Sequence, residues 1–169
     1  MNTARALAGF SIAGIMVLAP AAAHATAGPA TGTSDARAAQ AAAPTQWGPH
    51  HAAGRRAKAA GSLTATAKDD PGKPADRVTV TGSVTDLTAG SSTCGWAVFR
   101  VSTADAAGGV TLKQRSYRTC TQGKPLKFAF SHKKVYQVEL KVCAGAKAAK
   151  PSLTCLYAGT WKPLYTYYA

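Results

Sequence analysis

The stretch LKFAFSHKKVYQVELKVC, residues 126–143, carries the pattern that decides the fold. Apolar and polar residues alternate on both sides of a central segment, residues 132–134, and a period of two is typical of a half-buried β-strand. A tight turn over residues 132–134 predicts a hairpin with its apolar residues on one face and a Lys127–Glu139 pair on the other. The predicted apolar pairs are Phe130 with Tyr136, Phe128 with Val138, and Leu126 with Leu140.

The same symmetric pairing of residues about a turn predicts which cysteines are joined. A hairpin centred on residue 149 sets Cys143 opposite Cys155, and one centred on residue 107 sets Cys94 opposite Cys120. Directly opposed strand residues lie about 4.5–5.5 Å apart at Cα, which disulfide geometry accepts. These four cysteines are the only ones in the chain, and none forms the close C-x-x-C pair typical of zinc sites. We therefore predict two intra-hairpin disulfides, no metal site and no cofactor.

Short alternating runs continue from Val78 to the C-terminus, separated by turn residues such as those at 105–109. This pattern predicts an all-β fold. We expect a small antiparallel β-sandwich, Ig-like or Greek-key, of about six or seven short strands. Residues 153–161 are expected to form one of these strands. The aromatic tail, residues 161–168, is expected to pack as a closing strand, with a sugar-stacking platform as the alternative.

The first half of the chain has a different composition. Arg5, an apolar run over residues 6–18 and a small-residue site over residues 23–25 predict a secretory signal peptide, residues 1–25, with cleavage after residue 23 or 27 as alternatives. Residues 26–75 are rich in Ala, Gly, Pro and Thr and have Trp47 as their only large aromatic residue. We expect a flexible leader or linker there, followed by a secreted, disulfide-stapled domain over residues 76–169 with no membrane span.

The chain is strongly basic, with a formal net charge of +13. Residues 76–169 hold nine Lys and four Arg against three Asp and one Glu, so this segment alone has a net charge of +9. Such a field favours anionic partners, although it also keeps a secreted protein soluble. A basic strand with one aromatic residue, together with its neighbouring hairpins, supplies the expected binding residues. These are Lys113, Arg115, Tyr117, Arg118, Lys127 and Lys141.

The sequence shows no arrangement of catalytic residues. Glu139 is the only Glu, no G-x-S-x-G elbow occurs, and nothing brings two carboxylates together. We therefore predict a secreted, cationic, non-catalytic β domain that binds an anionic polymer, such as a wall phosphate polymer or nucleic acid, or a cell surface. The alternative is a small secreted effector, a protease inhibitor or toxin, that presents the loop over residues 144–152.

Overall fold

The computed structural model describes residues 43–66, 72–90 and 92–168. The predicted signal peptide, residues 1–25, lies outside them. The described residues form seven strands, one 3-10 helix and one short α-helix, and the strands form one antiparallel sheet. In chain order these are β1 (Thr45–His51), η1 (Ala53–Arg55), β2 (Ala57–Thr66), β3 (Ala75–Asp86), β4 (Thr93–Ala104), β5 (Val110–Thr119), β6 (Leu126–Ala146), α1 (Leu153–Tyr157) and β7 (Lys162–Thr166).

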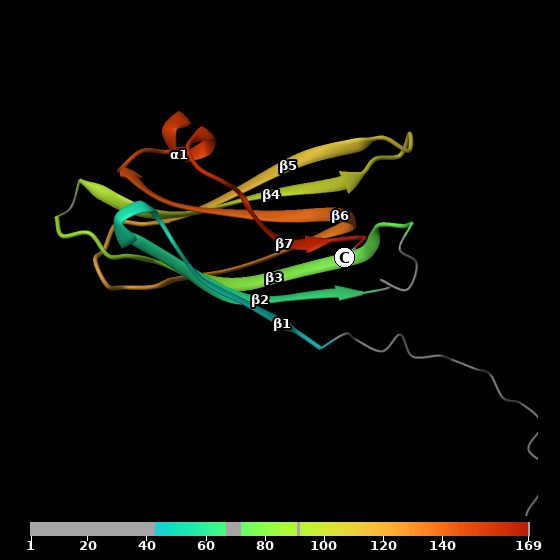
Figure 1. Ribbon diagram of the computed structural model, residues 1–169, viewed down its shortest axis with the longest axis horizontal. Helices are drawn as coiled ribbons and strands as arrows, with labels where there is room; N and C mark the ends of the chain where they lie inside the picture. Colours follow the sequence, from blue (N-terminus) through green and yellow to red (C-terminus); the bar gives the residue numbers. More distant parts are fainter. Residues whose placement is uncertain (1–42, 67–71, 91, 169) are drawn as a thin grey trace, which may run out of the picture. The chain divides into compact units, whose positions relative to one another are not determined.

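The sheet has two layers, one with β1, β2 and β3 and the other with β4 and β5, and strand β6 connects them. The sheet order is β1-β2-β3-β6-β4-β5, with β7 also paired to β6. The first half of β6 pairs with β3 and its second half pairs with β4, so that Val135 has Ala75 as one partner and Thr103 as the other. Beside it, Lys134 has a positive φ of 54°. Figure 1 shows β6 bending over at this point, which folds the sheet onto itself.

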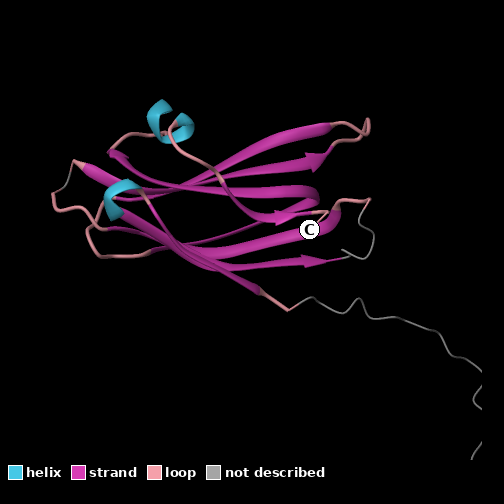
Figure 2. Ribbon diagram, viewed as in Figure 1, coloured by secondary structure: helices cyan, strands magenta, loops and turns pink. Residues whose placement is uncertain are grey.

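The hydrophobic core lies between these two layers (Figure 2). Phe99 of β4 is fully buried at its centre and makes edge contacts with Trp47 of β1 and with Phe128 and Phe130 of β6. Aromatic pairs in this geometry add stability beyond the apolar area they bury. The all-β prediction is confirmed, with the difference that the strands belong to one folded-over sheet.

The hairpin predicted for residues 126–143 is wrong, because the two halves of this stretch pair with other strands and not with each other. The chain does reverse at residues 132–134, but its two halves lie in different layers and do not pair with each other. Phe130 lies opposite Val80 of β3, and Leu140 lies opposite Phe99 of β4. The predicted Lys127–Glu139 pair is absent because Glu139 binds Arg100, with an Nη2–Oε2 distance of 2.8 Å.

The leader predicted for residues 26–75 is also wrong where the structure describes it. Residues 45–66 form β1 and β2, and the Trp47 side chain is buried. Its ring packs on Gly61 and Gly82, which are directly opposed in β2 and β3. A Cβ atom at either glycine would lie within 2.8 Å of Trp47 Cζ2, so only glycine leaves room for the ring. Residues 26–42 and 67–71 lie outside the described residues.

Both predicted disulfides are confirmed: Cys94–Cys120 and Cys143–Cys155. The first joins opposed ends of β4 and β5, as predicted. The second joins β6 to α1, so the hairpin predicted around residue 149 is wrong, and so is the strand expected over residues 153–161: residues 153–157 form α1 and residues 158–161 form no strand. Ser152 begins this helix, and its Oγ accepts a hydrogen bond from the Cys155 N–H at 3.1 Å. Serine at this position stabilises the first helical turn.

The aromatic tail packs as a closing strand, as predicted. Residues 162–166 form β7 on β6, and Tyr165 is buried in the core. Tyr167 packs edge-on against Tyr136, with ring centroids 5.1 Å apart, and its backbone N–H donates to the Tyr136 carbonyl.

Replacing Trp47 with Ala is expected to lower the free energy of unfolding by about 3–5 kcal/mol, because it leaves a cavity above the paired glycines. Denaturant unfolding with the disulfides intact measures this change. Thr45→Ala, an exposed position in the same strand, is the control and is expected to change stability by less than about 0.5 kcal/mol. An unchanged midpoint for Trp47→Ala would mean that β1 does not contribute to the folded domain.

Candidate functional site

Strand β5 is an edge strand whose predicted basic residues divide between its two faces. Lys113, Arg115 and Tyr117 lie opposite Val101, Phe99 and Ala97 of β4, which are core residues. The three β5 side chains therefore point to the core side of the sheet. Lys113 and Arg115 remain exposed, and Tyr117 is half-buried. β5 contains no acidic residue.

Tyr117 meets aromatic residues of the other layer. Its ring stacks on Phe128 at a centroid distance of 4.5 Å and on Phe130 at 6.1 Å, and Phe130 contacts His132 in turn. Burial lowers the pKa of His132, and the positive charges of Arg115 and Lys113 lower it further, which places these cations near the imidazole. We call the set Lys113, Arg115, Tyr117, Phe130 and His132 the basic–aromatic row.

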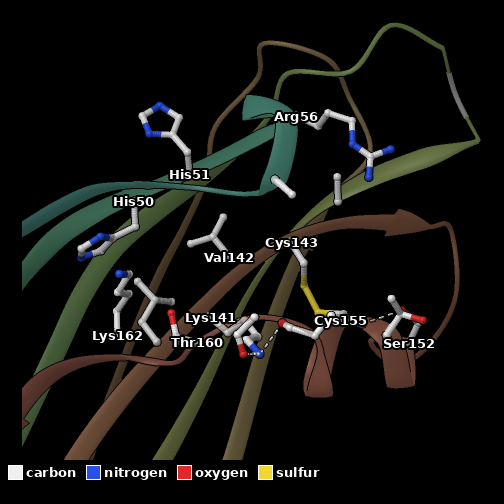
Figure 3. A pocket seen from close by; sticks show the side chains of 16 residues that line it. His50, His51, Arg56, Lys141, Val142, Cys143, Ser152, Cys155, Thr160 and Lys162 are labelled. Atoms are coloured by element: carbon white, nitrogen blue, oxygen red, sulfur yellow. Dashed lines mark hydrogen bonds between the residues drawn. A yellow bond between two sulfur atoms is a disulfide. The ribbon is translucent and has the colours of Figure 1, made fainter.

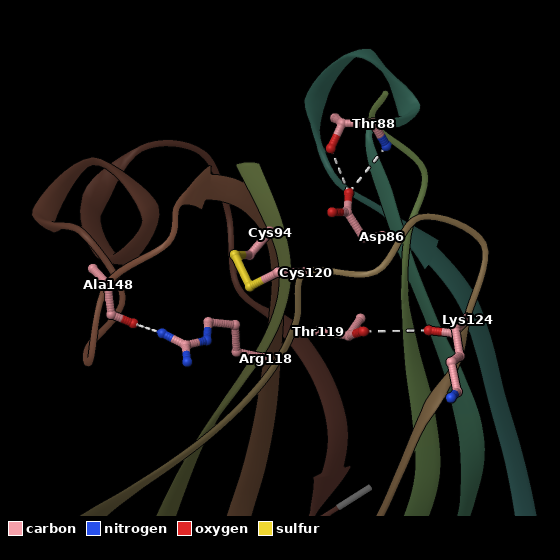
Figure 4. Close-up of a disulfide and its surroundings, with 8 residues drawn as sticks. All are labelled: Asp86, Thr88, Cys94, Arg118, Thr119, Cys120, Lys124 and Ala148. Carbon is pink, nitrogen blue, oxygen red and sulfur yellow. Dashed lines mark hydrogen bonds between the residues drawn. A yellow bond between two sulfur atoms is a disulfide. The ribbon is translucent and has the colours of Figure 1, made fainter. Parts of the chain in front are cut away.

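Arg118 belongs to a different environment. It points to the opposite face of β5, where its guanidinium lies 5.5 Å from the centroid of the Trp96 ring and donates to the Ala148 carbonyl. Figure 4 shows this contact beside the Cys94–Cys120 disulfide. Arg118 and Trp96, which are opposed in β5 and β4, therefore form a cation–π pair. Arg118 holds the loop after β6 against the sheet and is not part of the row.

The two remaining predicted binding residues lie away from the row. Lys127 is exposed and lies opposite Ser83, on the outer face of the other layer. Lys141 is buried, with 5% of its surface exposed, so its prediction as a binding residue is wrong.

Lys141 has a structural role. Its ammonium donates to the carbonyls of Leu156, Ala158 and Gly159 at 3.2, 2.7 and 3.0 Å, and it lies 5.1 Å from the centroid of the Trp161 ring. Burial lowers the pKa of Lys141, and the charge of Arg100 lowers it further. The three hydrogen bonds compensate for the desolvation of the charge, and they fix the segment that leads from α1 to β7.

A cavity of about 440 Å³ lies where the end of β1 approaches β6 and α1. Figure 3 shows His50 and Lys162 at one end and Arg56 toward the other, with the Cys143–Cys155 disulfide in the wall. None of the described residues that line this cavity is Asp or Glu. The sequence prediction missed it because His50 and Arg56 fall in the expected leader. The sequence feature that could have indicated this site is the cluster Trp47-Gly48-Pro49-His50-His51, which is unusual in an Ala-rich stretch.

His50 is held in place at the inner end of this cavity. Its imidazole lies parallel to the Trp47 ring, with centroids 6.4 Å apart. Burial lowers the pKa of His50, with smaller contributions from the charges of Lys162 and His51. These shifts favour the neutral imidazole, and Lys162 is close enough for its charge to act on His50.

The carboxylates of the described residues all have structural partners. Asp76 pairs with Lys134, and Glu139 with Arg100. Asp86 accepts hydrogen bonds from the backbone and hydroxyl of Thr88 (Figure 4), and Asp105 accepts from backbone N–H groups in its turn. Within the described part of the chain, no three His, Cys, Asp or Glu residues group as metal ligands.

Comparisons with models of known protein families, with curated proteins and with solved structures find no match to this chain. Across the described ranges, no helix has the length and apolarity that a membrane crossing requires.

Replacing Lys141 with Met is expected to lower the free energy of unfolding by about 2 kcal/mol, because three carbonyls lose a charged donor. Chemical denaturation at neutral pH measures the loss. Lys127→Met removes the same charge from an exposed site and is expected to change stability little. Equal stability of the two variants would contradict the structural role of Lys141.

Proposed function

We propose that this chain is a secreted, cationic, non-catalytic β-domain protein that binds a phosphodiester polymer through the basic–aromatic row. The observation that supports this most directly is the alignment of Lys113, Arg115 and Tyr117 on one face of an edge strand. The two disulfides are compatible with an extracellular location.

The spacing within the row suits a repeating anion. Residues two apart in a strand lie about 6.6 Å apart along the strand axis, so a chain of phosphates lying along β5 meets Lys113 and then Arg115. The half-buried rings of Tyr117, Phe130 and His132 lie beside these cations and add contact surface for a base or a sugar ring. The neighbouring core-face residues of β4 are apolar, so they do not neutralise either cation.

The absence of free carboxylates among the described residues supports a binding role over a catalytic one. General acid–base chemistry needs a group that can exchange a proton with the substrate. Here each acidic side chain of the described ranges has a partner within the fold, and Asp86, whose Oδ2 accepts no hydrogen bond, is fully buried.

We expect binding to weaken steeply with salt, because neutralised phosphates release counterions. The log–log slope should be about −0.7 to −0.9 for each phosphate contacted. Replacing Lys113 and Arg115 together with Ser should flatten this slope by the equivalent of about two contacts. The measurement is a salt titration against a teichoic-type polymer and, separately, a single-stranded oligonucleotide, which tells the two polymer sources apart.

The matched control for this titration is Lys127→Ser with Lys133→Ser. It removes the same charge from exposed positions of β6 in the other layer. A slope that flattens equally in both double variants would assign binding to net charge alone. Failure of the natural sequence to bind either polymer at about 50 mM salt, where screening is weak, would overturn the proposal.

One observation favours the effector alternative. Residues 146–150 of the loop over residues 144–152 are all exposed. The loop is held by the Lys147 N–H, which donates to the Ser92 carbonyl, and by the Arg118 contact to Ala148. An exposed and anchored loop is what a protease inhibitor presents. A panel of trypsin-like proteases, with Lys147→Ala and Lys150→Ala as variants, tests this function directly.

A further inference from the structure

The cavity beside β1 exists because β7 covers only part of the β6 edge. The β6–β7 pairing reaches Leu140 opposite Lys162, and within the described residues no strand pairs with this edge of β6 beyond that point. The chain before β7 is held away from the edge by the Cys143–Cys155 disulfide and by Lys141, whose ammonium binds the carbonyls after α1. The part of the wall formed by α1 and the residues after it is therefore held in place by the fold.

Besides His51 and Lys141, whose ammonium binds the carbonyls after α1, three cationic or titratable side chains from separate segments line this space. His50 comes from β1, Arg56 from the turn between β1 and β2, and Lys162 from β7. Among the described residues, none forms a hydrogen bond or an ion pair with any of these three side chains. Side chains of this kind at an acid-free cavity, with no partner of their own, are arranged to receive a ligand with more than one negative charge.

The remainder of the wall is suited to an organic group. Val142, Ala158 and the Cys143–Cys155 disulfide provide apolar surface, while Thr160 and Ser152 add hydroxyl groups (Figure 3). The volume of about 440 Å³ is larger than a bare phosphate requires and falls in the range of small-molecule sites.

We propose that this cavity binds a small organic phosphate, with the phosphate between His50 and Lys162 and the organic part against Val142 and the disulfide, toward Arg56. A phosphomonoester carries about −1.5 to −2 charges at pH 7, which matches this cationic lining better than a single carboxylate does. The site is separate from the basic–aromatic row, so the proposal goes beyond the polymer-binding function and does not depend on it.

The pKa of His50 reports ligand binding independently of the measured affinity. In the free protein its pKa is lowered by burial and by the charges of Lys162 and His51, the two charged groups that act on it. A bound phosphate offsets those charges and stabilises the imidazolium. The pKa of His50 should therefore rise on binding, while the pKa of His132, in the row, should not.

The test is a titration of the full chain with glycerol 3-phosphate, followed by calorimetry and by histidine NMR resonances. We expect saturable binding, a raised pKa of His50, and weaker binding of both inorganic phosphate and glycerate. Lys162→Gln should reduce affinity by about tenfold, the loss of one charge-assisted hydrogen bond, and Arg56→Gln, at the other end of the cavity, should reduce it less. Both positions are exposed, so these variants should fold.

Two controls separate this site from general charge effects. Lys58→Gln changes an exposed residue of β2 that does not line the cavity, and it should leave the affinity unchanged. Lys113→Ser with Arg115→Ser should also leave it unchanged, whatever that variant does to polymer binding. Equal losses in Lys58→Gln and Lys162→Gln, or His50 resonances that do not respond to glycerol 3-phosphate, would overturn the proposal.

Discussion

The whole domain depends on one strand that belongs to both layers. β6 binds β3 with its first half and β4 with its second, and it bends at residues 132–134 to do so. Because one strand supplies backbone hydrogen bonds to both layers, neither layer can move without disturbing the other. The core residues of β6, among them Phe128 and Leu140, therefore face each other across the interior although they lie close in sequence.

The second half of β6 also organises the end of the domain that holds the cavity. Cys143 ties α1 to the strand, and Lys141 holds the carbonyls that follow α1. The Cys143–Cys155 disulfide and the Lys141 ammonium come from positions two residues apart in β6. Both restrict where the chain can run before β7. The space left between this segment, β6 and β1 is a consequence of those two constraints.

Acidic and basic side chains have different roles in this domain. In the described residues the acidic side chains form ion pairs or cap turns, so each is used within the fold. The cations outnumber them, and several, including Lys113, Arg115 and Lys162, have no such partner. The positive field therefore comes from particular exposed positions on β5 and around the cavity, where an anion can approach them.

The sequence by itself determined the β class, the Cys94–Cys120 pairing and the closing strand, because alternation is a local property of the chain; it also predicted the Cys143–Cys155 pair, but from a hairpin that the structure replaces with α1. It could not choose the partners of β6, since alternation shows which residues share a face but not which strand lies beside them. It also misjudged β1 and β2, whose small residues are buried by a Trp47 ring resting on two glycines. Only the tertiary structure places His50 and Lys162 at one cavity, because that cavity lies between the first and last strands of the described fold.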